Sequence, residues 1–226
     1  VFIQSTFQHK KKDRCSCCIG VSEKVFNKGE EQMNKRAAVM TFHRALNYGA
    51  ILQAFALENI LADIGVHAEI IDYRCPHIER VYRPFDVRHC KNLSSGVKKC
   101  IKSFGLIQKR HNFNEFTKQY LNVTKKCRTK KDLRRTASDF GIIITGSDQV
   151  LNPDAAGGDF SYFLDFAGSD IQKIAYAASL GFRSFPQKYE SACMKHLKSF
   201  KSISVREKSA CKTVGALTDK PVENVL

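Results

Sequence analysis

The sequence predicts an α/β fold built on a doubly wound parallel sheet. Short, continuous apolar runs are typical of strands buried on both faces, and amphipathic helical segments separate these runs along the chain. Polar residues follow the end of each run, where the loops of such a sheet gather. We expect this domain to cover residues 36–226.

The first strand–helix–strand unit lies near the start of the domain. Residues 37–42 (AAVMTF) form an apolar run, and 43–49 follow as a loop. Residues 50–64 place apolar side chains three and four positions apart, which predicts an amphipathic helix. Residues 66–73 supply the next strand. Such a unit has a right-handed crossover between parallel strands.

The segment from 74 to 136 is basic and less regular. Pro76, Pro84 and Gly96 interrupt its helical pattern. We expect helices near 94–121 and 129–138.

The alternation then resumes. Residues 140–145 form a continuous apolar strand that runs directly into a polar loop. Residues 173–178 and 202–205 indicate two further strands, and 187–200 has a helical pattern between them. Strands that alternate with helices in this way favour a sheet covered on both faces.

Residues 1–35 are polar and lysine-rich and show no sustained period, which predicts a poorly ordered tail or linker. Cys15, Cys17 and Cys18 lie there without a second cysteine pair, so no metal site is predicted. The nine cysteines are odd in number and irregularly spaced, which favours reduced thiols. No apolar run is long enough to span a membrane, and we expect a cytoplasmic protein.

The net charge of +15 favours anionic partners. Basic residues concentrate at 10–12, 98–102 and 125–135, without the interleaved aromatic residues that would stack on nucleic-acid bases. Nucleic-acid binding is therefore disfavoured. A peripheral contact with an anionic membrane surface and a phosphorylated substrate stay open, and a basic run is more often a solvated helix face.

Candidate site residues follow the predicted strands, because ligands of open parallel sheets bind beyond the carboxyl ends of the strands. Each cluster also has a simpler explanation as a turn, a helix cap, tight packing or a local ion pair. No dinucleotide, P-loop, nucleophile-elbow or HExxH motif occurs. Of the seven histidines, only His43 follows a strand that would expose it to a ligand. The candidates are His43, Asn47, Tyr48, Gly49, Gln53, Gly146, Ser147, Asp148, Gln149, Ser179, Gly181 and Arg206.

The same segments carry a resemblance to a known family. Residues 41–54 (TFHRALNYGAILQA) look like the opening of polysaccharide pyruvyl transferase domains. Three later blocks agree in order: 146–153 (GSDQVLNP), 162–166 together with 175–181, and 204–207 (SVRE). Four ordered blocks are more specific than any single one.

The resemblance implies a Rossmann-like lobe, similar to the amino-terminal lobe of two-lobed GT-B-like transferases. Leu151 stands where the family commonly has tryptophan. The family's second lobe would follow Leu226, so we expect this chain to be the first half of a catalytic unit and inactive alone.

The activity implied by the resemblance is transfer of a pyruvyl group from phosphoenolpyruvate to sugar hydroxyls of a cell-surface polysaccharide or its precursor, with no cofactor or metal. Asp148 would orient or deprotonate the acceptor hydroxyl, His43 would serve as acid or base, and Arg206 would hold an anion. The remaining candidates would bind substrate. The alternatives are a non-catalytic sugar- or nucleotide-binding module and a cysteine-based redox protein.

Overall fold

A computed structural model describes residues 36–82, 93–182 and 185–225, and for 93–103 it describes the backbone alone. The expected tail at 1–35, with its CxCC segment, and the residue Pro84 lie outside the described residues.

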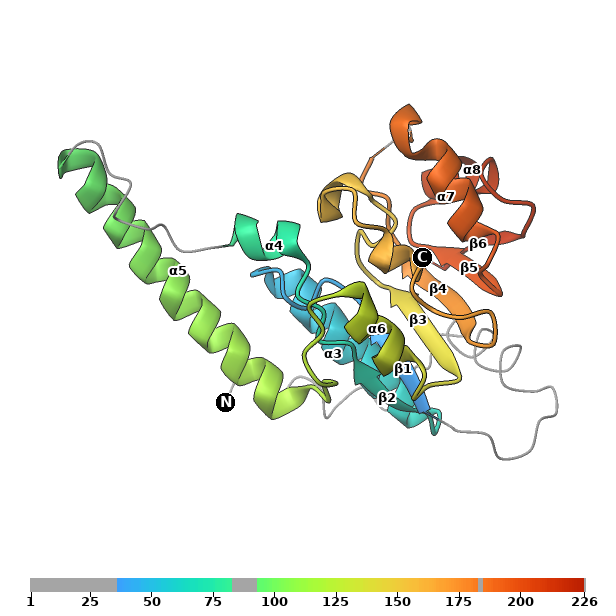
Figure 1. Cartoon of the computed structure of the whole chain (residues 1–226), viewed down its shortest axis with the longest axis horizontal. Coiled ribbons are helices and arrows are strands. Elements are labelled where there is room, and N and C mark those ends of the chain that lie inside the picture. The colour runs from blue at the N-terminus through green and yellow to red at the C-terminus, as the bar shows by residue number, and fades with distance from the viewer. Residues whose placement is uncertain (1–35, 83–92, 183–184, 226) are drawn as a thin grey trace.

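The core of the fold is one sheet of six strands, all parallel, in the order β2-β1-β3-β4-β5-β6 (Figure 1). The predicted doubly wound α/β fold is confirmed. The strands are β1 (Arg36–Met40), β2 (His67–Ile70), β3 (Ile142–Gly146), β4 (Gln172–Ala178), β5 (Ser202–Val205) and β6 (Val222–Asn224). The helices are α3 (Tyr48–Asp63), α4 (Pro76–Val81), α5 (Leu93–Tyr120), α6 (Lys130–Ala137), α7 (Glu190–Leu197) and α8 (Lys208–Gly215). The short 3-10 helices are η2 (Asp154–Ala156), η3 (Phe160–Phe163) and η4 (Gln187–Tyr189).

The strand order reverses at β1. The chain passes from β1 outward to β2, and then returns to pair β3 with the other side of β1. The loops after β1 and β3 therefore leave in opposite directions. In open α/β sheets this reversal opens a crevice beyond the carboxyl ends of the two strands, where ligands bind.

Two apolar clusters fill the two faces of the sheet. Ala37 and Val39 of β1 pack with residues of α3 and α5, whereas Ala38 and Met40 pack with residues of α6, α7 and α8. This alternation is the period of two that a strand requires when both faces are covered. Leu151, at the position where tryptophan is common in the family, is fully buried in the second of these clusters.

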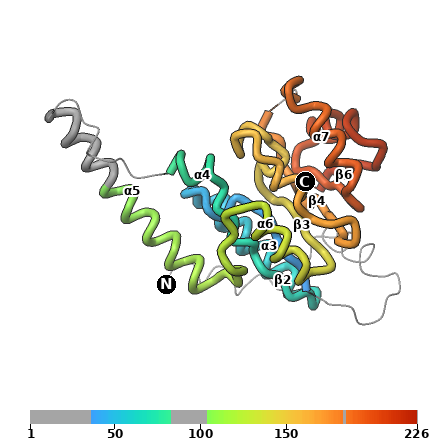
Figure 2. The backbone as a smooth tube through the Cα atoms, viewed as in Figure 1, coloured from blue at the N-terminus to red at the C-terminus, as the bar shows by residue number. Residues whose placement is uncertain are grey.

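The second half of α5 lies beside α3 (Figure 2). The ring of Phe55 on α3 meets the rings of Phe116 and Tyr120, with centroids 5.9 and 6.1 Å apart. Glu58 of α3 accepts hydrogen bonds from the backbone and side-chain nitrogens of Asn122, just after α5. These contacts fix α5 against the β1–β2 side of the molecule.

Local signals explain where the helices begin. The side chain of Asn47 caps α3 by accepting a hydrogen bond from the backbone nitrogen of Gly49 at 2.8 Å. Thr129 and Asp132 form a capping box at the start of α6. The predicted helices and strands are confirmed, but the interpretation of Pro76 was wrong. It occupies the first turn of α4, where a backbone N–H would have no partner within the helix, so proline costs no hydrogen bond there.

The four described cysteines, Cys75, Cys127, Cys193 and Cys211, form no disulfide. Burial raises the pKa of Cys193 to about 12, so its thiol stays protonated. In the described ranges, no group of histidine, cysteine and acidic side chains could hold a metal ion, and no helix is long and apolar enough to cross a membrane.

The end of β3 approaches β4 unusually closely. Gly146 has φ of +156°, and a Cβ atom there would lie 1.9 Å from the carbonyl oxygen of Tyr176. The next residue, Ser147, has φ of 51° and donates its backbone N–H to the same carbonyl at 3.0 Å. On the facing strand, Ala177 has φ of 46° beside a register shift. Backbone strain of this kind concentrates at functional sites.

This close approach predicts that Gly146→Ala destabilises the protein. The added methyl group would overlap the Tyr176 carbonyl, which belongs to backbone and cannot turn away, so we expect a loss of at least about 2 kcal/mol in the free energy of unfolding. The control is Gly141→Ala, because a Cβ atom at Gly141 meets nothing within 4 Å. Urea unfolding of both variants measures the difference. Equal midpoints would show that the β3–β4 approach is not rigid.

Candidate active site

Buried polar atoms without partners concentrate at the carboxyl edge of the sheet. The described residues contain seven such side-chain atoms. Five belong to residues that follow strands: Thr41 and Arg44 after β1, Arg74 after β2, Ser147 after β3 and Glu207 after β5. Folded proteins satisfy nearly all of their buried polar groups, so a local excess of unpaired ones indicates a site that a ligand completes.

One group of these residues, which we call the Asp148 cluster, consists of Ser147, Asp148, Ser179, Arg206 and Glu207. The loops after β3, β4 and β5 bring them together. The Ser179 hydroxyl donates to Oε1 of Glu207 at 2.6 Å, and the Ser179 backbone N–H donates to the Asp148 carbonyl at 2.9 Å. The Arg206 guanidinium lies 3.4 Å from the same Glu207 oxygen. Oε2 of Glu207 is buried and has no partner.

Asp148 has the electrostatics of a candidate acid or base. Burial raises its pKa, while the backbone N–H of Gln149 and the charge of Arg206 oppose that rise. The N–H of Gln149 donates to Oδ1 of Asp148 at 2.8 Å. A carboxyl group whose pKa is moved toward neutrality exchanges protons more readily at physiological pH.

Gln149 is held by a close contact with Gly181. Gly181 has φ of +69°, and a Cβ atom there would lie 2.5 Å from the side-chain oxygen of Gln149. The backbone conformation therefore favours glycine, and a larger residue would also displace the exposed side chain of Gln149. The contact places the amide of Gln149 over the loop that follows β4.

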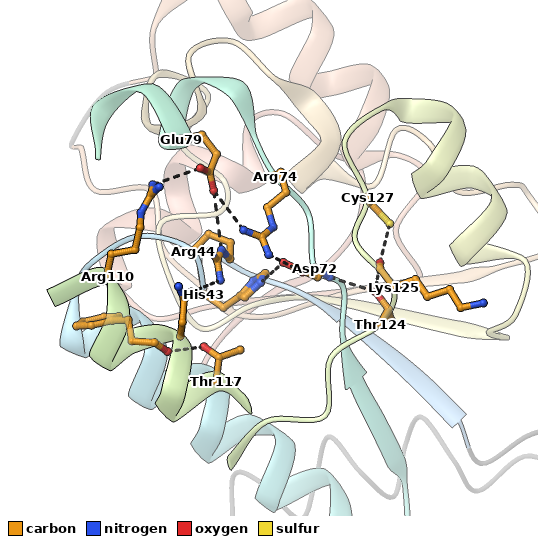
Figure 3. Close-up of polar contacts among 12 residues, drawn as sticks. His43, Arg44, Asp72, Arg74, Glu79, Arg110, Thr117, Thr124, Lys125 and Cys127 are labelled. Atoms are coloured by element: carbon orange, nitrogen blue, oxygen red, sulfur yellow. Dashed lines mark hydrogen bonds and ion pairs between the residues drawn. The ribbon is translucent and has the colours of Figure 1, made fainter. Parts of the chain in front are cut away.

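His43 lies elsewhere than expected. Its side chain is 1% exposed, so the expectation that the end of β1 exposes it to a ligand was wrong. Ring nitrogen Nε2 lies 3.3 Å from Oδ1 of Asp72, and Nδ1 lies 3.3 Å from the Thr41 carbonyl oxygen (Figure 3). Burial lowers the pKa of His43 despite the neighbouring Asp72. The neutral ring carries one N–H and donates to one of these two acceptors.

Asp72 joins His43 to an arginine. Nη2 of Arg74 donates to Oδ2 of Asp72 at 2.8 Å, and the backbone N–H of Asp72 donates to the Thr124 hydroxyl at 3.1 Å. Burial disfavours the Asp72 carboxylate, but the hydrogen bonds from His43 and Arg74 and the charge of Arg74 outweigh it. They hold the pKa of Asp72 well below its usual range.

Three guanidinium groups continue this network and surround Glu79 (Figure 3). They belong to Arg44, Arg74 and Arg110, which we call the arginine cluster. The distances from their nitrogens to the Glu79 carboxylate are 3.9, 3.7 and 3.3 Å. Burial, together with the charge of Arg74, lowers the pKa of Arg44. The lowered pKa therefore reflects burial first and the neighbouring positive charge second.

The candidates at the start of α3 are partly exposed. Asn47, Tyr48 and Gly49 lie at the surface, and the Tyr48 ring is covered by the Lys109 ammonium at 5.2 Å. Gln53 follows one turn later, and its side-chain oxygen is buried without a partner.

The structure therefore divides the sequence candidates. It brings Ser147, Asp148, Ser179 and Arg206 into one cluster, with Gly146, Gln149 and Gly181 shaping its loops. In the described part of the chain, no hydrogen bond or ion pair joins this cluster to His43 or to the first turn of α3.

Sequence reasoning missed several residues of this edge. Glu207 directly follows Arg206 but was not among the candidate site residues. Asp72 and Arg74 directly follow β2, so the rule applied to the other strand ends would have found them. Arg110 carried no local signal, because it reaches the edge from the long helix α5.

Asp72→Asn should lower stability in a pH-dependent way. His43 and Arg74 would lose a charged partner, and we expect a loss of about 2–3 kcal/mol near neutral pH. Because the folded-state pKa of Asp72 is depressed, its stabilisation is full above the ordinary aspartate pKa and disappears as pH falls through the folded value. Unfolding midpoints of the variant and the wild type should therefore converge in acid.

The matched control is Asp63→Asn, which removes an exposed carboxylate at the end of α3. It should leave the midpoint unchanged at every pH. If the difference in unfolding midpoint between Asp72→Asn and the wild type stayed constant from neutral pH into acid, Asp72 would not have the lowered pKa that we assign to it.

Comparison with known proteins identifies the family of the chain. The family model described as polysaccharide pyruvyl transferase matches residues 47–225, which is most of the chain and includes the whole Asp148 cluster. No curated protein and no solved structure matches the chain. The match covers every strand after β1, together with the loops that carry the candidate residues. On this evidence, the chain belongs to the polysaccharide pyruvyl transferase family.

Proposed function

We propose that the protein transfers the pyruvyl group of phosphoenolpyruvate to sugar hydroxyls of a cell-surface polysaccharide or its precursor, on the cytoplasmic side and without a cofactor. Family membership supports a sugar or polysaccharide substrate. The observation that carries the proposal is the concentration of buried, unpaired polar atoms at the carboxyl edge of the sheet. These atoms offer both donors and acceptors to a polar, anionic substrate.

The reaction sets clear demands on the site. Protonation of the methylene carbon of phosphoenolpyruvate develops positive charge at the neighbouring carbon, which a sugar hydroxyl attacks. In ketal formation, a second hydroxyl forms the next carbon–oxygen bond as the carbon–phosphate oxygen bond breaks and phosphate leaves. Of the two hydroxyl protons, one balances the proton gained by the methylene carbon and the other leaves with phosphate or solvent.

Asp148 is the group we assign to proton transfer. Its raised pKa suits a base that accepts the proton of the acceptor hydroxyl, and its side chain lies beside the positive charge of Arg206. Arg206 would hold the carboxylate or phosphate of the donor. Glu207 keeps Arg206 and Ser179 in place through one shared oxygen, which leaves its other oxygen free to accept a substrate hydroxyl.

The remaining candidates would bind and orient substrate. Ser147, Gln149 and Ser179 can donate or accept hydrogen bonds at the ends of β3 and β4, and the glycines Gly146 and Gly181 let backbone approach closely. Asn47, Tyr48, Gly49 and Gln53 would extend the binding surface along the start of α3. A charge of +15 would also favour a peripheral contact with an anionic membrane, where polysaccharide precursors are assembled.

His43 has a different role in this proposal. A ring that is buried against Asp72 and the Thr41 carbonyl does not reach a substrate directly. We assign it to positioning, because it fixes Asp72 and, through it, Arg74 at the end of β2.

The test of the function is acceptor-dependent release of phosphate from phosphoenolpyruvate, measured on a chain that includes the second lobe expected from the family resemblance. A panel of sugars and polysaccharide precursors should include one that raises phosphate release and gains the mass of a pyruvyl ketal. Binding of sugars with no phosphate release across the panel would favour a non-catalytic sugar-binding module instead.

Asp148→Asn should lose activity while keeping the fold. The two side chains are nearly isosteric, and the asparagine oxygen can still accept the hydrogen bond from Gln149. If Asp148 transfers a proton, turnover should fall by about 100-fold or more. Asp139→Asn serves as the control, because Asp139 is an exposed carboxylate ahead of the amino end of β3.

We expect Asp148→Asn to change the free energy of unfolding in the opposite direction from Asp72→Asn. Because burial raises the folded-state pKa of Asp148, ionisation disfavours folding once pH exceeds the ordinary aspartate value. The variant should therefore match or exceed the melting temperature of the wild type at neutral pH and equal it in acid. Normal turnover would remove Asp148 from the mechanism, and a large fall in melting temperature would assign it a structural capping role.

A further inference from the structure

The arginine cluster is distinct from the Asp148 cluster, and the proposed reaction gives none of its three arginines a catalytic role. Its three side chains come from different elements: Arg44 from the loop after β1, Arg74 from the loop after β2, and Arg110 from α5. All three guanidinium groups lie within 4 Å of one carboxylate, that of Glu79. They therefore converge on one small region (Figure 3).

Among the described residues, the cluster has more positive charge than its partners neutralise. Three guanidinium groups face two carboxylates, those of Glu79 and Asp72, and burial lowers the pKa of the neighbouring His43, which favours its neutral ring. This count leaves one net positive charge among the described groups, where the Arg44 side chain is only 12% exposed. Charges with so little access to water are normally paired.

The donors of the cluster are also far from saturated. Each guanidinium carries several N–H groups, yet the three together make three hydrogen bonds to described residues: to Asn114, Asp72 and Glu79. Nε of Arg44 and Nε of Arg74 are buried and have no hydrogen-bond partner. A network that only tied α5 to the sheet would be expected to pair these donors.

The position of the cluster also suits a ligand. It lies at the carboxyl edge, beyond β1 and β2, beside the point where the strand order reverses. β1 and β5 are three positions apart in the sheet, which places Arg44 and Arg206 on strand ends about 14 Å apart. The two arginines therefore belong to different parts of the carboxyl edge.

From these contacts we infer a second anion-binding site, formed by Arg44, Arg74 and Arg110, that takes a phosphoryl group. Three guanidinium groups that approach from three elements match the several terminal oxygens of a tetrahedral phosphoryl group better than the two oxygens of a planar carboxylate. The inference shares with the proposed function the buried Nε atoms of Arg44 and Arg74, but the charge and geometry that favour a phosphoryl group belong to the arginine cluster alone.

Binding of inorganic phosphate and pyrophosphate, measured by titration calorimetry on the whole chain, tests the site. Ionic strength is held constant with sodium chloride, so that general attraction to a basic protein does not vary. Arg110→Gln should weaken binding about tenfold or more, since one charge-assisted contact is lost. Lys118→Gln is the matched control, because it removes the same charge from an exposed position on the same helix.

A second variant tests the site from the opposite direction. Glu79→Gln removes the carboxylate that competes for the three arginines, and it should tighten phosphate binding at least about threefold. A structural ion-pair network would gain no affinity from that change. If Arg110→Gln does not fold, the Glu79→Gln titration decides alone.

Three results would overturn the inference. The first is no binding of phosphate or pyrophosphate to the wild-type chain at millimolar concentration. The second is equal affinity for Arg110→Gln and Lys118→Gln, or no gain for Glu79→Gln. The third is loss of binding in Arg206→Gln with none in Arg110→Gln, which would assign the anion to the Asp148 cluster.

Discussion

The pairing of β1 with both β2 and β3 in one parallel sheet is the constraint on which the rest of the structure depends. Parallel strands leave all their carboxyl ends at one edge, and the reversal at β1 separates the loops that leave that edge. The two apolar clusters hold this sheet from both faces. The polar side chains that follow the strands are consequently collected at the edge, where the core cannot cover them.

The two halves of that edge have different chemistry. Beyond β3, β4 and β5, a carboxyl group with a raised pKa lies beside one arginine, and two buried oxygens there have no partner. Beyond β1 and β2, a carboxylate with a lowered pKa contacts a histidine and an arginine, and the Nε atoms of Arg44 and Arg74 have no hydrogen-bond partner. The first half suits proton transfer, and the second suits the binding of an anion.

Sequence reasoning could predict the sheet because its signals are local. The apolar runs AAVMTF and GIIIT became β1 and β3, and the polar residues after β3 to β5 met as neighbours once those strands paired in parallel. No element was predicted after residue 205, so the helix α8 and the strand β6 were both missed.

The burial of His43 could not be predicted in the same way. It depends on Asp72, 29 residues away on a different strand end, and a pattern along the chain does not say which side chains pair across the sheet. Arg44 and Asn114 meet across 70 residues for the same reason, through the packing of α5 against α3. Pairs of this kind are set by tertiary contacts alone.

The central claim is that the carboxyl edge of the sheet, with its unpaired polar atoms, is where substrate binds. The most direct measurement is a titration of phosphoenolpyruvate followed by amide nitrogen–proton correlation spectra of the isotope-labelled protein. The account predicts that the largest shifts fall in the loops after the strands, at 41–44, 147–149, 179–181 and 206–207. Shifts confined to the amino edge of the sheet, or to the surface of α7 around Met194 and Lys198, would contradict it.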